Sequence, residues 1–405
     1  METDTIKIGL FGLGTVGQGI YSVLGSAKNA HAEIRRICVR DASKPRGIQV
    51  PAELLTEKAD DILCDPEINL IVEVIDNAEA SYRIVTSALK RGIPVVSGNK
   101  AMIARHLPEL IELQRKHNVA LLYDASSCGS IPVIRNLEEY YDNDLLLEVK
   151  GILNGSSNYI LSRVFDHGEE YADALARAQK LGFAESDPTH DISGNDSLNK
   201  LVIITLHAIG VYVPPKDIFV YGIPTLRAED IRYAREKGMK IKLVAQVVKL
   251  SDAKFTMFVM PEFVAPNRYI YAVDDEYNGV VIRGECYDRQ FMFGKGAGGR
   301  PTASSLLSDI TALRHNYRYE YKKSGFSPRP EYTADVTLKI YARYEHTDLR
   351  AGLPWIAVNE EYRCDEYRYV IGEIRLSDLI TAAPLLRADD IFLCNFPRFF
   401  ADRDD

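Results

Sequence analysis

The segment from Ala184 to Lys200 gathers the side chains best suited to move a proton and to bind a cation. Asp196 and Lys200 stand four residues apart where an apolar helix is predicted to begin, so they share one face of that helix. Burial lowers the pKa of a lysine and a neighbouring carboxylate raises it, and the balance can leave a lysine able to exchange a proton. The alternative is an ordinary helix ion pair worth about 0.3–0.5 kcal/mol. The acidic loop just before the pair contains Glu185 and Asp191. These additional carboxylates favour a functional site over an ordinary ion pair.

Two glycine-rich segments have the form of dinucleotide-binding loops. The first, Gly12-Leu13-Gly14-Thr15-Val16-Gly17, follows an apolar run and opens a predicted helix. In such a loop the first glycine permits a tight turn, the second lets the backbone approach a pyrophosphate, and the third lets the helix pack on the strand. The second, Gly294–Gly299, also enters a helix and could close over the same cofactor. The alternative for the first segment is a tight turn that binds no ligand, and the alternative for the second is a flexible turn.

The residues after the predicted strand Ile34–Val39 bear on which dinucleotide binds. An NAD site usually places an acidic side chain there, near the adenosine ribose. Here Arg40 and Asp41 end the strand, and Lys44 and Arg46 follow. Arg40 could meet a 2′-phosphate, so NADP is favoured over NAD. The alternative is that Arg40 points to solvent and Asp41 binds the ribose, because a shift of one residue reverses the assignment.

Two polar segments at strand ends are further candidates. Ser97–Lys100 follows a short predicted strand at the carboxyl edge of the sheet, where open α/β sheets bind ligands, and Lys100 could donate to a carbonyl or a ribose. Asn154–Asn158 lies between a strand and a helix and can present backbone N–H groups to a carboxylate. For Lys100, the alternative is a solvent-exposed lysine at the start of a helix. For Asn154–Asn158, the alternative is simple capping of the following helix.

Alternating strands and helices must position these residues. From Ile6 to Tyr123, short apolar runs alternate with helical segments, which predicts βαβ units and a mainly parallel sheet. From Leu145 a second unit begins, in which the strands and helices follow a different pattern. Asn316–Arg329 is the best candidate for a later domain boundary. We therefore predict an α/β protein with a Rossmann-type domain (1–135, completed by 293–318), an α+β catalytic domain (136–292) and a small β-rich C-terminal region (325–405) of unknown role.

Composition narrows the class of protein. The chain has 405 residues, enough for two or three domains, and its net charge of -8 argues against nucleic acid or an anionic membrane as a partner. No apolar run is long enough to span a membrane, and the polar, acidic start does not resemble a signal peptide. The six cysteines lie far apart without a CxxC pair, so we expect reduced thiols in a cytoplasmic protein.

Five motifs in a fixed order resemble the homoserine dehydrogenase family. They are GLGTVG at 12–17, GNKA at 98–101, GILNGSSNYIL at 151–161, AESDPTHDISGNDSLNK at 184–200 and GKGAGGRPTAS at 294–304. The resemblance covers about residues 6–315. Many members carry a small regulatory ACT domain after this point, but the tail here shows no evident pattern of that kind, so we expect a divergent extension.

The resemblance implies the reversible, NAD(P)H-dependent reduction of L-aspartate 4-semialdehyde to L-homoserine, in threonine and methionine biosynthesis. Carried over by position, Lys200 donates the proton to the aldehyde oxygen and Asp196 orients it, while Lys100 lies near the nicotinamide; the family leaves open which lysine transfers the proton. The implied substrate contacts are Glu185 and Asp191 for the ammonium and Gly155 and Ser156 for the carboxylate. The implied cofactor contacts are Gly12, Leu13, Gly14, Thr15, Val16, Gly17, Arg40, Asn77, Lys100 and Gly298. A homodimer through the second domain is also implied.

The chain departs from the family at a cation site. Relatives hold a structural cation, often sodium, near a Glu-Ala-Ser/Thr-Val segment, whereas this chain has Asp124-Ala125-Ser126-Ser127. Backbone ligands would survive such substitutions, but the shorter acid puts the site in doubt. The expected ligands are Asp124, Ser127, Gly129 and Ile131. Asp76-Asn77 also replaces a common glycine pair, and Lys295 replaces a usual proline or alanine.

Two other functions compete with this one. The chain could be a cofactor-binding sensor that has lost catalysis, although the intact Lys100, Asp196 and Lys200 argue against it. It could also be a dehydrogenase of a related amino acid.

Overall fold

The computed structural model describes residues 5–27 and 30–397, which form two compact units. The first unit contains residues 1–142, 202–212 and 294–323, and the second contains residues 143–201, 213–293 and 324–405. Each unit is therefore assembled from separated stretches of the chain. Among the described residues, no helix is both long and apolar enough to cross a membrane.

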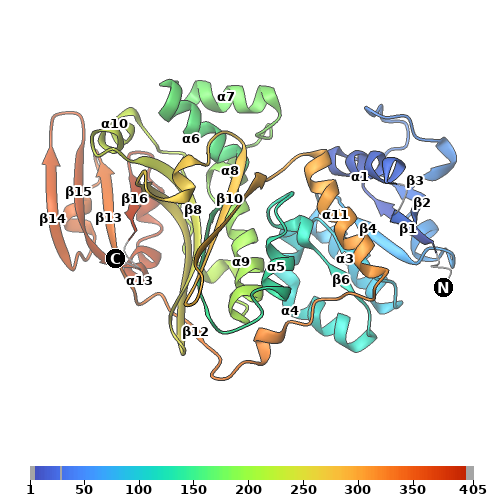
Figure 1. Cartoon of the computed structure of the whole chain (residues 1–405). Coiled ribbons are helices and arrows are strands. Elements are labelled where there is room, and N and C mark those ends of the chain that lie inside the picture. Colours follow the sequence, from blue (N-terminus) through green and yellow to red (C-terminus); the bar gives the residue numbers. More distant parts are fainter. Residues whose placement is uncertain (1–4, 28–29, 398–405) are drawn as a thin grey trace. The chain divides into compact units, whose positions relative to one another are not determined.

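The first unit is built on a six-stranded parallel sheet in the order β3-β2-β1-β4-β5-β6 (Figure 1). The strands are β1 (Ile6–Phe11), β2 (Ala32–Cys38), β3 (Leu55–Thr56), β4 (Leu70–Glu73), β5 (Val95–Ser97) and β6 (Leu121–Leu122). Every residue of β4 and β5 is buried, as expected for central strands of a parallel sheet that is covered on both faces. The strand order reverses between β1 and β4, the position at which open α/β sheets bind ligands.

Helices α1 and α11 lie side by side in this unit although they are far apart in sequence (Figure 1). The helices of the unit are α1 (Thr15–Ser26), α2 (Asp60–Leu63), α3 (Ala78–Lys90), α4 (Lys100–His117), α5 (Val133–Glu139) and α11 (Gly299–Leu313). A Cβ atom at Gly19 would lie 2.2 Å from the carbonyl oxygen of Gly299, so only glycine allows the two backbones to come this close.

The segment after α11, residues 316–323, packs its side chains into the same unit. Tyr319 and Tyr321 are buried, and the buried Lys323 donates to the carbonyls of Leu137 and His207 at 3.0 and 2.8 Å. Burial lowers the pKa of Lys323 to about 8. We call residues 316–323 the strap.

The second unit is built on a ten-stranded sheet in the order β11-β10-β7-β8-β9-β16-β13-β15-β14, with β12 (Glu331–Tyr332) beside β9. The strands before the tail are β7 (Leu146–Ile152), β8 (Lys240–Ser251), β9 (Lys254–Val264), β10 (Tyr277–Gly284) and β11 (Asp288–Lys295). The helices are α6 (Gly155–His167), α7 (Tyr171–Leu181), α8 (Thr189–Ile192), α9 (Asn195–Ile209) and α10 (Ala228–Glu236), and residues 202–212, which include the later part of α9, belong to the first unit.

The tail has a regular order that the sequence did not reveal. It runs β13 (Thr337–Tyr344), α12 (Leu349–Gly352), β14 (Ala357–Arg363), β15 (Arg368–Arg375), α13 (Leu376–Thr381) and β16 (Phe392–Phe396). This is the βαββαβ order of ferredoxin-like units, and its four strands are antiparallel to their neighbours within the tail. The sequence showed no evident pattern of this kind, because the two helices have only four and six residues and give almost no periodic signal.

The tail continues the sheet of the second unit and shares its core. Strand β16 pairs with β9 through Asn395 and Glu262. One hydrophobic cluster joins Phe258 and Met260 of β9 to tail residues such as Leu338 and Ile374. These features confirm the predicted fold class: a Rossmann-type α/β unit, a second unit of strands and helices, and a small β-rich C-terminal region.

Candidate active site

The first glycine loop leaves room for a ligand at the start of α1. Gly12 has a φ of +99°, and a Cβ atom at Gly17 would lie 2.2 Å from the Gly12 carbonyl oxygen, so both glycines serve the packing of the turn. Gly14 differs, because a Cβ atom there would meet nothing within 4 Å. Gly14 is the N-cap of α1 and makes no side-chain cap, which leaves the helix N-terminus to attract an anion. The loop therefore fits a dinucleotide pyrophosphate.

The second glycine loop lies beside the first. A Cβ atom at Gly299 would approach the carbonyl oxygen of Thr15, the first residue of α1, at 2.7 Å. Gly298 is the N-cap of α11 and has a φ of +113°. The backbones of the two glycine loops are thus in contact, and both helices begin at the same place in the first unit.

At the ribose end, the acidic side chain is already engaged. Asp41 accepts hydrogen bonds from the amide of Ser43 at 2.8 Å and from its hydroxyl at 2.6 Å, and these bonds lower the pKa of the carboxyl group. The Arg46 guanidinium donates to the carbonyls of Asp41, Ala42 and Lys44 and so orders the turn. Arg40, just before this turn, is exposed.

The residues at the ends of β4 and β5 cap the helices that follow them. Asn77 caps α3 by accepting from the amide of Ala80 at 2.8 Å. Asn99 caps α4 by accepting from the amide of Met102 at 2.9 Å, and Lys100 is the first residue of that helix. Both segments lie at the carboxyl edge of the sheet, where ligands bind in this fold.

In the second unit, a hydrogen-bonded cluster forms around Lys200. The Lys200 Nζ donates to Asp196 Oδ2 at 2.7 Å and to the carbonyl of Leu153 at 2.6 Å. The side chains of Lys200 and Asp196 are only 7% and 5% exposed, so the pair is not a solvated surface ion pair. Asn154 donates from Nδ2 to Asp196 at 2.8 Å and to Asp191 at 2.7 Å. Lys200 is thus paired with Asp196, and the Asn154 amide links Asp196 to a second carboxylate, Asp191.

The other predicted substrate contacts lie on either side of this cluster. Asn154 also caps α6, because its Oδ1 accepts from the amide of Ser157 at 2.8 Å, and Gly155 and Ser156 form the first turn of that helix. The Ser156 hydroxyl donates to the carbonyl of Phe183 at 2.5 Å, so only its backbone remains for a ligand. Glu185 lies in the exposed loop before α8 and is not a member of the hydrogen-bonded cluster.

The sequence predicted only part of what two asparagines of this site do. Capping of the following helix was one reading of Asn154–Asn158, but the link from Asn154 Nδ2 to Asp191 and Asp196 was not predicted. Asn278 on β10 had no local signal at all. It is fully buried, donates to the same Leu153 carbonyl as Lys200 at 3.1 Å, and its Oδ1 has no hydrogen-bond partner within the described structure. It supports the carbonyl that receives the lysine.

Three of the four predicted cation ligands already accept hydrogen bonds within the protein, and the cation site stays a prediction. Asp124 Oδ1 accepts from the amides of Ile134 and Arg135 at 2.9 and 3.2 Å and so serves as a cap for α5. The carbonyl of Gly129 accepts from Ser305, and the carbonyl of Ile131 accepts from a nearby backbone amide. Ser127 is buried.

Comparisons with known proteins connect both units to one enzyme family. A model described as "Homoserine dehydrogenase, NAD binding domain" matches residues 12–124, and a model described as "Homoserine dehydrogenase" matches residues 132–311. A homoserine dehydrogenase of Corynebacterium glutamicum is 35% identical over 417 residues, 96% of this chain and 94% of that protein. The Bacillus subtilis homoserine dehydrogenase is 31% identical and covers 84% of this chain and 82% of its own length.

Solved structures show the same relationship. The crystal structure of a homoserine dehydrogenase from Thiobacillus denitrificans matches with a TM-score of 0.80 and 27% identity, over 98% of this chain and 99% of that one. A hyperthermophilic archaeal homoserine dehydrogenase in complex with NADPH matches with a TM-score of 0.65 and 25% identity, over 78% of this chain and 99% of that one. No comparison supports a sensor without catalysis or a dehydrogenase of another amino acid. The chain belongs to the homoserine dehydrogenase family of NAD(P)-dependent oxidoreductases, which interconvert L-aspartate 4-semialdehyde and L-homoserine.

Proposed function

We propose that Lys200 is the proton donor and acceptor of this reaction and that Asp196 orients it. In the direction of reduction, a nicotinamide cofactor held by the two glycine loops would supply the hydride that the aldehyde carbon takes up. The Lys200 ammonium gives its proton to the aldehyde oxygen, which becomes the hydroxyl of homoserine, and in the direction of oxidation the neutral amine takes that proton back. Asp196 and the Leu153 carbonyl fix the position of Nζ through their hydrogen bonds.

We propose that the same cluster binds the amino-acid end of the substrate. Asp191 and Asp196 are brought together by Asn154, and carboxylates of this kind attract an ammonium group. Asp191, with Glu185 from the adjacent loop, holds the ammonium. The backbone N–H groups of Gly155 and Ser156, at the N-terminus of α6, hold the carboxylate.

The hydrogen-bonded cluster of the buried Asp196, Lys200 and Asn154 with the half-buried Asp191 is the observation that carries this assignment. The test is NAD(P)H formation from L-homoserine at alkaline pH, followed at 340 nm with each cofactor, with and without added L-threonine. We expect turnover with homoserine. An absence of turnover with both cofactors would contradict the assigned activity, and tight NADPH binding without turnover would favour the sensor.

We propose that the enzyme prefers NADP to NAD and that Lys100 contacts the nicotinamide half of the cofactor. The support is that Asp41 is bound within its own turn, whereas the exposed Arg40 stands beside it. The NADPH complex of the archaeal relative is consistent with this preference. Arg40→Ala should raise the KM for NADP at least fivefold and leave the KM for NAD within twofold. An equal effect on both cofactors would contradict the assignment.

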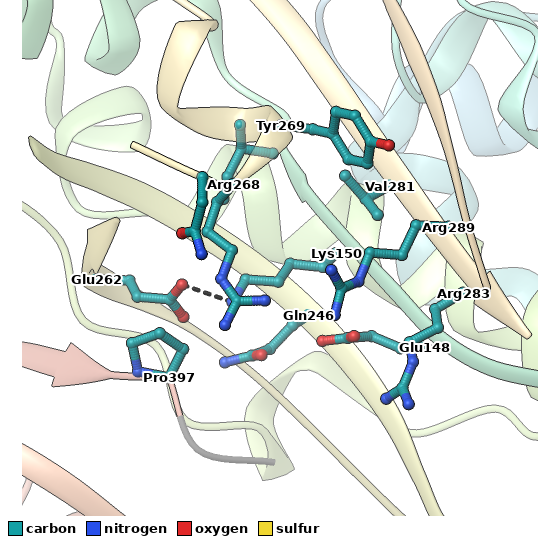
Figure 2. A pocket seen from close by; sticks show the side chains of 12 residues that line it. Glu148, Lys150, Gln246, Glu262, Arg268, Tyr269, Val281, Arg283, Arg289 and Pro397 are labelled. Carbon is teal, nitrogen blue, oxygen red and sulfur yellow. Dashed lines mark ion pairs between the residues drawn. The ribbon is translucent and has the colours of Figure 1, made fainter. Parts of the chain in front are cut away.

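We propose a homodimer formed through one face of the second unit. Figure 2 shows a hollow on this face, lined by side chains from β7 to β11 and the segment that follows β9, among them Glu148, Lys150, Glu262, Arg268 and Arg289. Lys150 and Glu262 form an ion pair of 2.5 Å within the hollow. Both signs of charge are present, as a surface that meets its own copy requires.

Aromatic side chains next to the hollow strengthen this proposal. Tyr269 stacks on Phe291 and Tyr277 stacks on Phe293, yet Tyr269 and Phe293 remain 52% exposed. Exposed aromatic groups of this kind are enriched in protein interfaces. The double variant Tyr269→Asp/Phe293→Asp should be monomeric in sedimentation velocity. Tyr140→Asp, at an exposed tyrosine of the first unit, should leave the dimer intact. A wild-type monomer would contradict the proposal.

The cytoplasmic location stays a prediction.

A further inference from the structure

Glu73 is a buried carboxylate at the carboxyl edge of the first unit's sheet. It is the last residue of β4, and it pairs with Phe11 of β1 on one side and with Ser97 of β5 on the other. Phe11 immediately precedes the first glycine loop, and Ser97 precedes the segment that ends in Lys100. Glu73 thus lies between two of the predicted cofactor-binding segments, at the point where the strand order reverses.

Four hydrogen bonds join Glu73 to the turns that follow β4 and β5 in a closed ring. Glu73 Oε1 accepts from the amide of Ile75 at 2.8 Å, and the carbonyl of Ile75 accepts from Asn99 Nδ2 at 2.9 Å. The amide of Asn99 donates to Ser97 Oγ at 3.1 Å, and the Ser97 hydroxyl donates to Glu73 Oε2 at 2.7 Å. We call this set of four residues the Glu73 ring. It locks the turn after β4 to the turn after β5.

A carboxylate in this position is costly. Glu73 and Ser97 are fully buried, and burial raises the pKa of Glu73, although hydrogen bonds from Ser81, Ser97 and Ile75 oppose this effect. The donors of these bonds are uncharged. Burying a charge with uncharged partners destabilises a fold relative to an apolar side chain of similar size. Fold stability alone would disfavour a glutamate at position 73. A role of the ring in positioning other residues accounts for its presence.

The ring fixes the residue from which the Lys100 helix starts. Asn99 uses its amide and Nδ2 in the ring and its Oδ1 to cap α4, so all its polar side-chain groups are committed. Lys100 is the next residue. Its backbone direction is therefore set by Asn99, and Asn99 is set by Glu73 and Ser97.

We propose that Glu73 is a positioning residue, which acts through the Ser97–Asn99 hydrogen bonds to hold Lys100 in place for the cofactor. This inference rests on the proposed role of Lys100 at the nicotinamide. Glu73 touches neither substrate nor cofactor; it sets the geometry of a residue that does.

The test compares variants that break the ring with one that keeps it. Ser97→Ala removes the hydroxyl that joins Asn99 to Glu73 and changes little else, and Glu73→Met breaks both bonds of the carboxylate. Glu73→Gln keeps the ring connected with one bond reversed, because its carbonyl accepts from Ile75 and its amide donates to Ser97 Oγ, whose hydroxyl proton must then turn to another acceptor. We expect Ser97→Ala and Glu73→Met to lower kcat at least tenfold and to weaken NADPH binding at least threefold. The KM for homoserine should change less than threefold, and Glu73→Gln should stay within threefold of wild type throughout.

A double-mutant cycle separates positioning from general damage to the fold. If the ring acts through Lys100, then Ser97→Ala in a Lys100→Met background lowers kcat no further than Lys100→Met alone. Full additivity, or wild-type kcat and NADPH affinity in Ser97→Ala, would overturn the proposal. A wild-type enzyme that binds NADPH but does not oxidise homoserine would contradict the proposed function instead. The ring would then be judged by NADPH affinity, and an unchanged Kd in Ser97→Ala would still overturn it.

Discussion

Lys200 has two short hydrogen bonds, one to a carboxylate and one to a main-chain carbonyl, and both acceptors are held by other residues. Asp196 is bound by Asn154, and the Leu153 carbonyl also accepts from Asn278. Neither acceptor can relax freely if the lysine is replaced, because both are buried. The ammonium is therefore fixed in position before a substrate arrives, as efficient proton transfer requires.

Removal of the Lys200 amine should abolish most of the turnover. Lys200→Ala should lower kcat for homoserine oxidation at least tenfold, with a smaller change in the KM for NADP, because the cofactor loops belong to the other unit. The measurement is steady-state kinetics at saturating cofactor. Lys180→Ala, at the end of the exposed helix α7, is the matched control and should retain wild-type kcat. A Lys200→Ala enzyme with wild-type kcat would rule out its role in proton transfer.

The sequence predicted this pair but not its surroundings. A spacing of four residues at the head of an apolar helix is a local pattern, so Asp196 and Lys200 could be found together. Asn278 reaches the site from a strand nearly eighty residues later in the chain, and Glu73 meets Ser97 only because β4 and β5 are neighbours. Contacts of this kind depend on strand order, which a single sequence does not reveal.

At the scale of elements, the contact between α1 and α11 depends on the absence of a side chain. Gly19 faces the backbone of Gly299, whereas Gly25, later in α1, has nothing within 4 Å of its missing Cβ. The same substitution in one helix should therefore have opposite effects at the two positions.

Gly19→Ala should destabilise the protein by about 1–3 kcal/mol, because the new methyl group collides with main-chain atoms that cannot turn away. Gly25→Ala should stabilise it by about 0.5–1 kcal/mol, the ordinary gain of alanine over glycine within a helix. The measurement is urea-induced unfolding followed by circular dichroism. Equal free energies of unfolding for the two variants would contradict the close packing of α1 on α11.

The strap should make stability depend on pH through Lys323. Its pKa in the folded protein is about 8, below the value of about 10.4 expected in the unfolded chain. Between these values the unfolded state binds a proton that the folded state lacks, so stability rises with pH, by up to about 1.4 kcal/mol per pH unit. The penalty for burying the charge is fully present below pH 8.

Lys323→Met removes this titration. The free energy of unfolding of wild type, measured relative to Lys323→Met, should increase from pH 8 to pH 10. Lys322→Met, at the neighbouring exposed lysine of the strap, should leave that increase in place. Parallel pH profiles for wild type and Lys323→Met would show that Lys323 does not titrate in this range.

The predictability of elements followed their length. Helices of ten or more residues and the buried strands of the first unit carry clear periodic patterns, so the Rossmann-type order could be predicted. The tail could not, because α12 and α13 are short and its strand order is visible only through pairing with β9 and within the tail. Its fold is set by neighbours that lie far away in the sequence.

At the scale of the whole molecule, a buried ion pair joins the tail to the rest of the second unit. Arg343 on β13 donates from Nε to both oxygens of Asp230 on α10, at 2.9 and 3.1 Å, and its other nitrogens donate to the carbonyls of Asp390 and Thr225. Both side chains are fully buried. The pair therefore helps to fix the position of the tail against the rest of the second unit.

Arg343→Met should destabilise the protein by about 3–5 kcal/mol, because it leaves the Asp230 carboxylate buried without its partner. Arg343→Met/Asp230→Leu should recover much of that loss, since no unpaired charge remains. Chemical denaturation of the four members of this cycle measures the coupling. Additive losses in the double variant would contradict a direct interaction.

The order of the segments along the chain has a consequence for biosynthesis. The packing of α1 requires α11, which the ribosome makes about 280 residues later, on the order of 15–60 s at ordinary rates of translation. The second unit likewise waits for β13 and β16 to cover Phe258 and Met260. Neither unit can be completed until segments in the last quarter of these 405 residues have emerged, so a nascent chain that stalls earlier contains no finished unit.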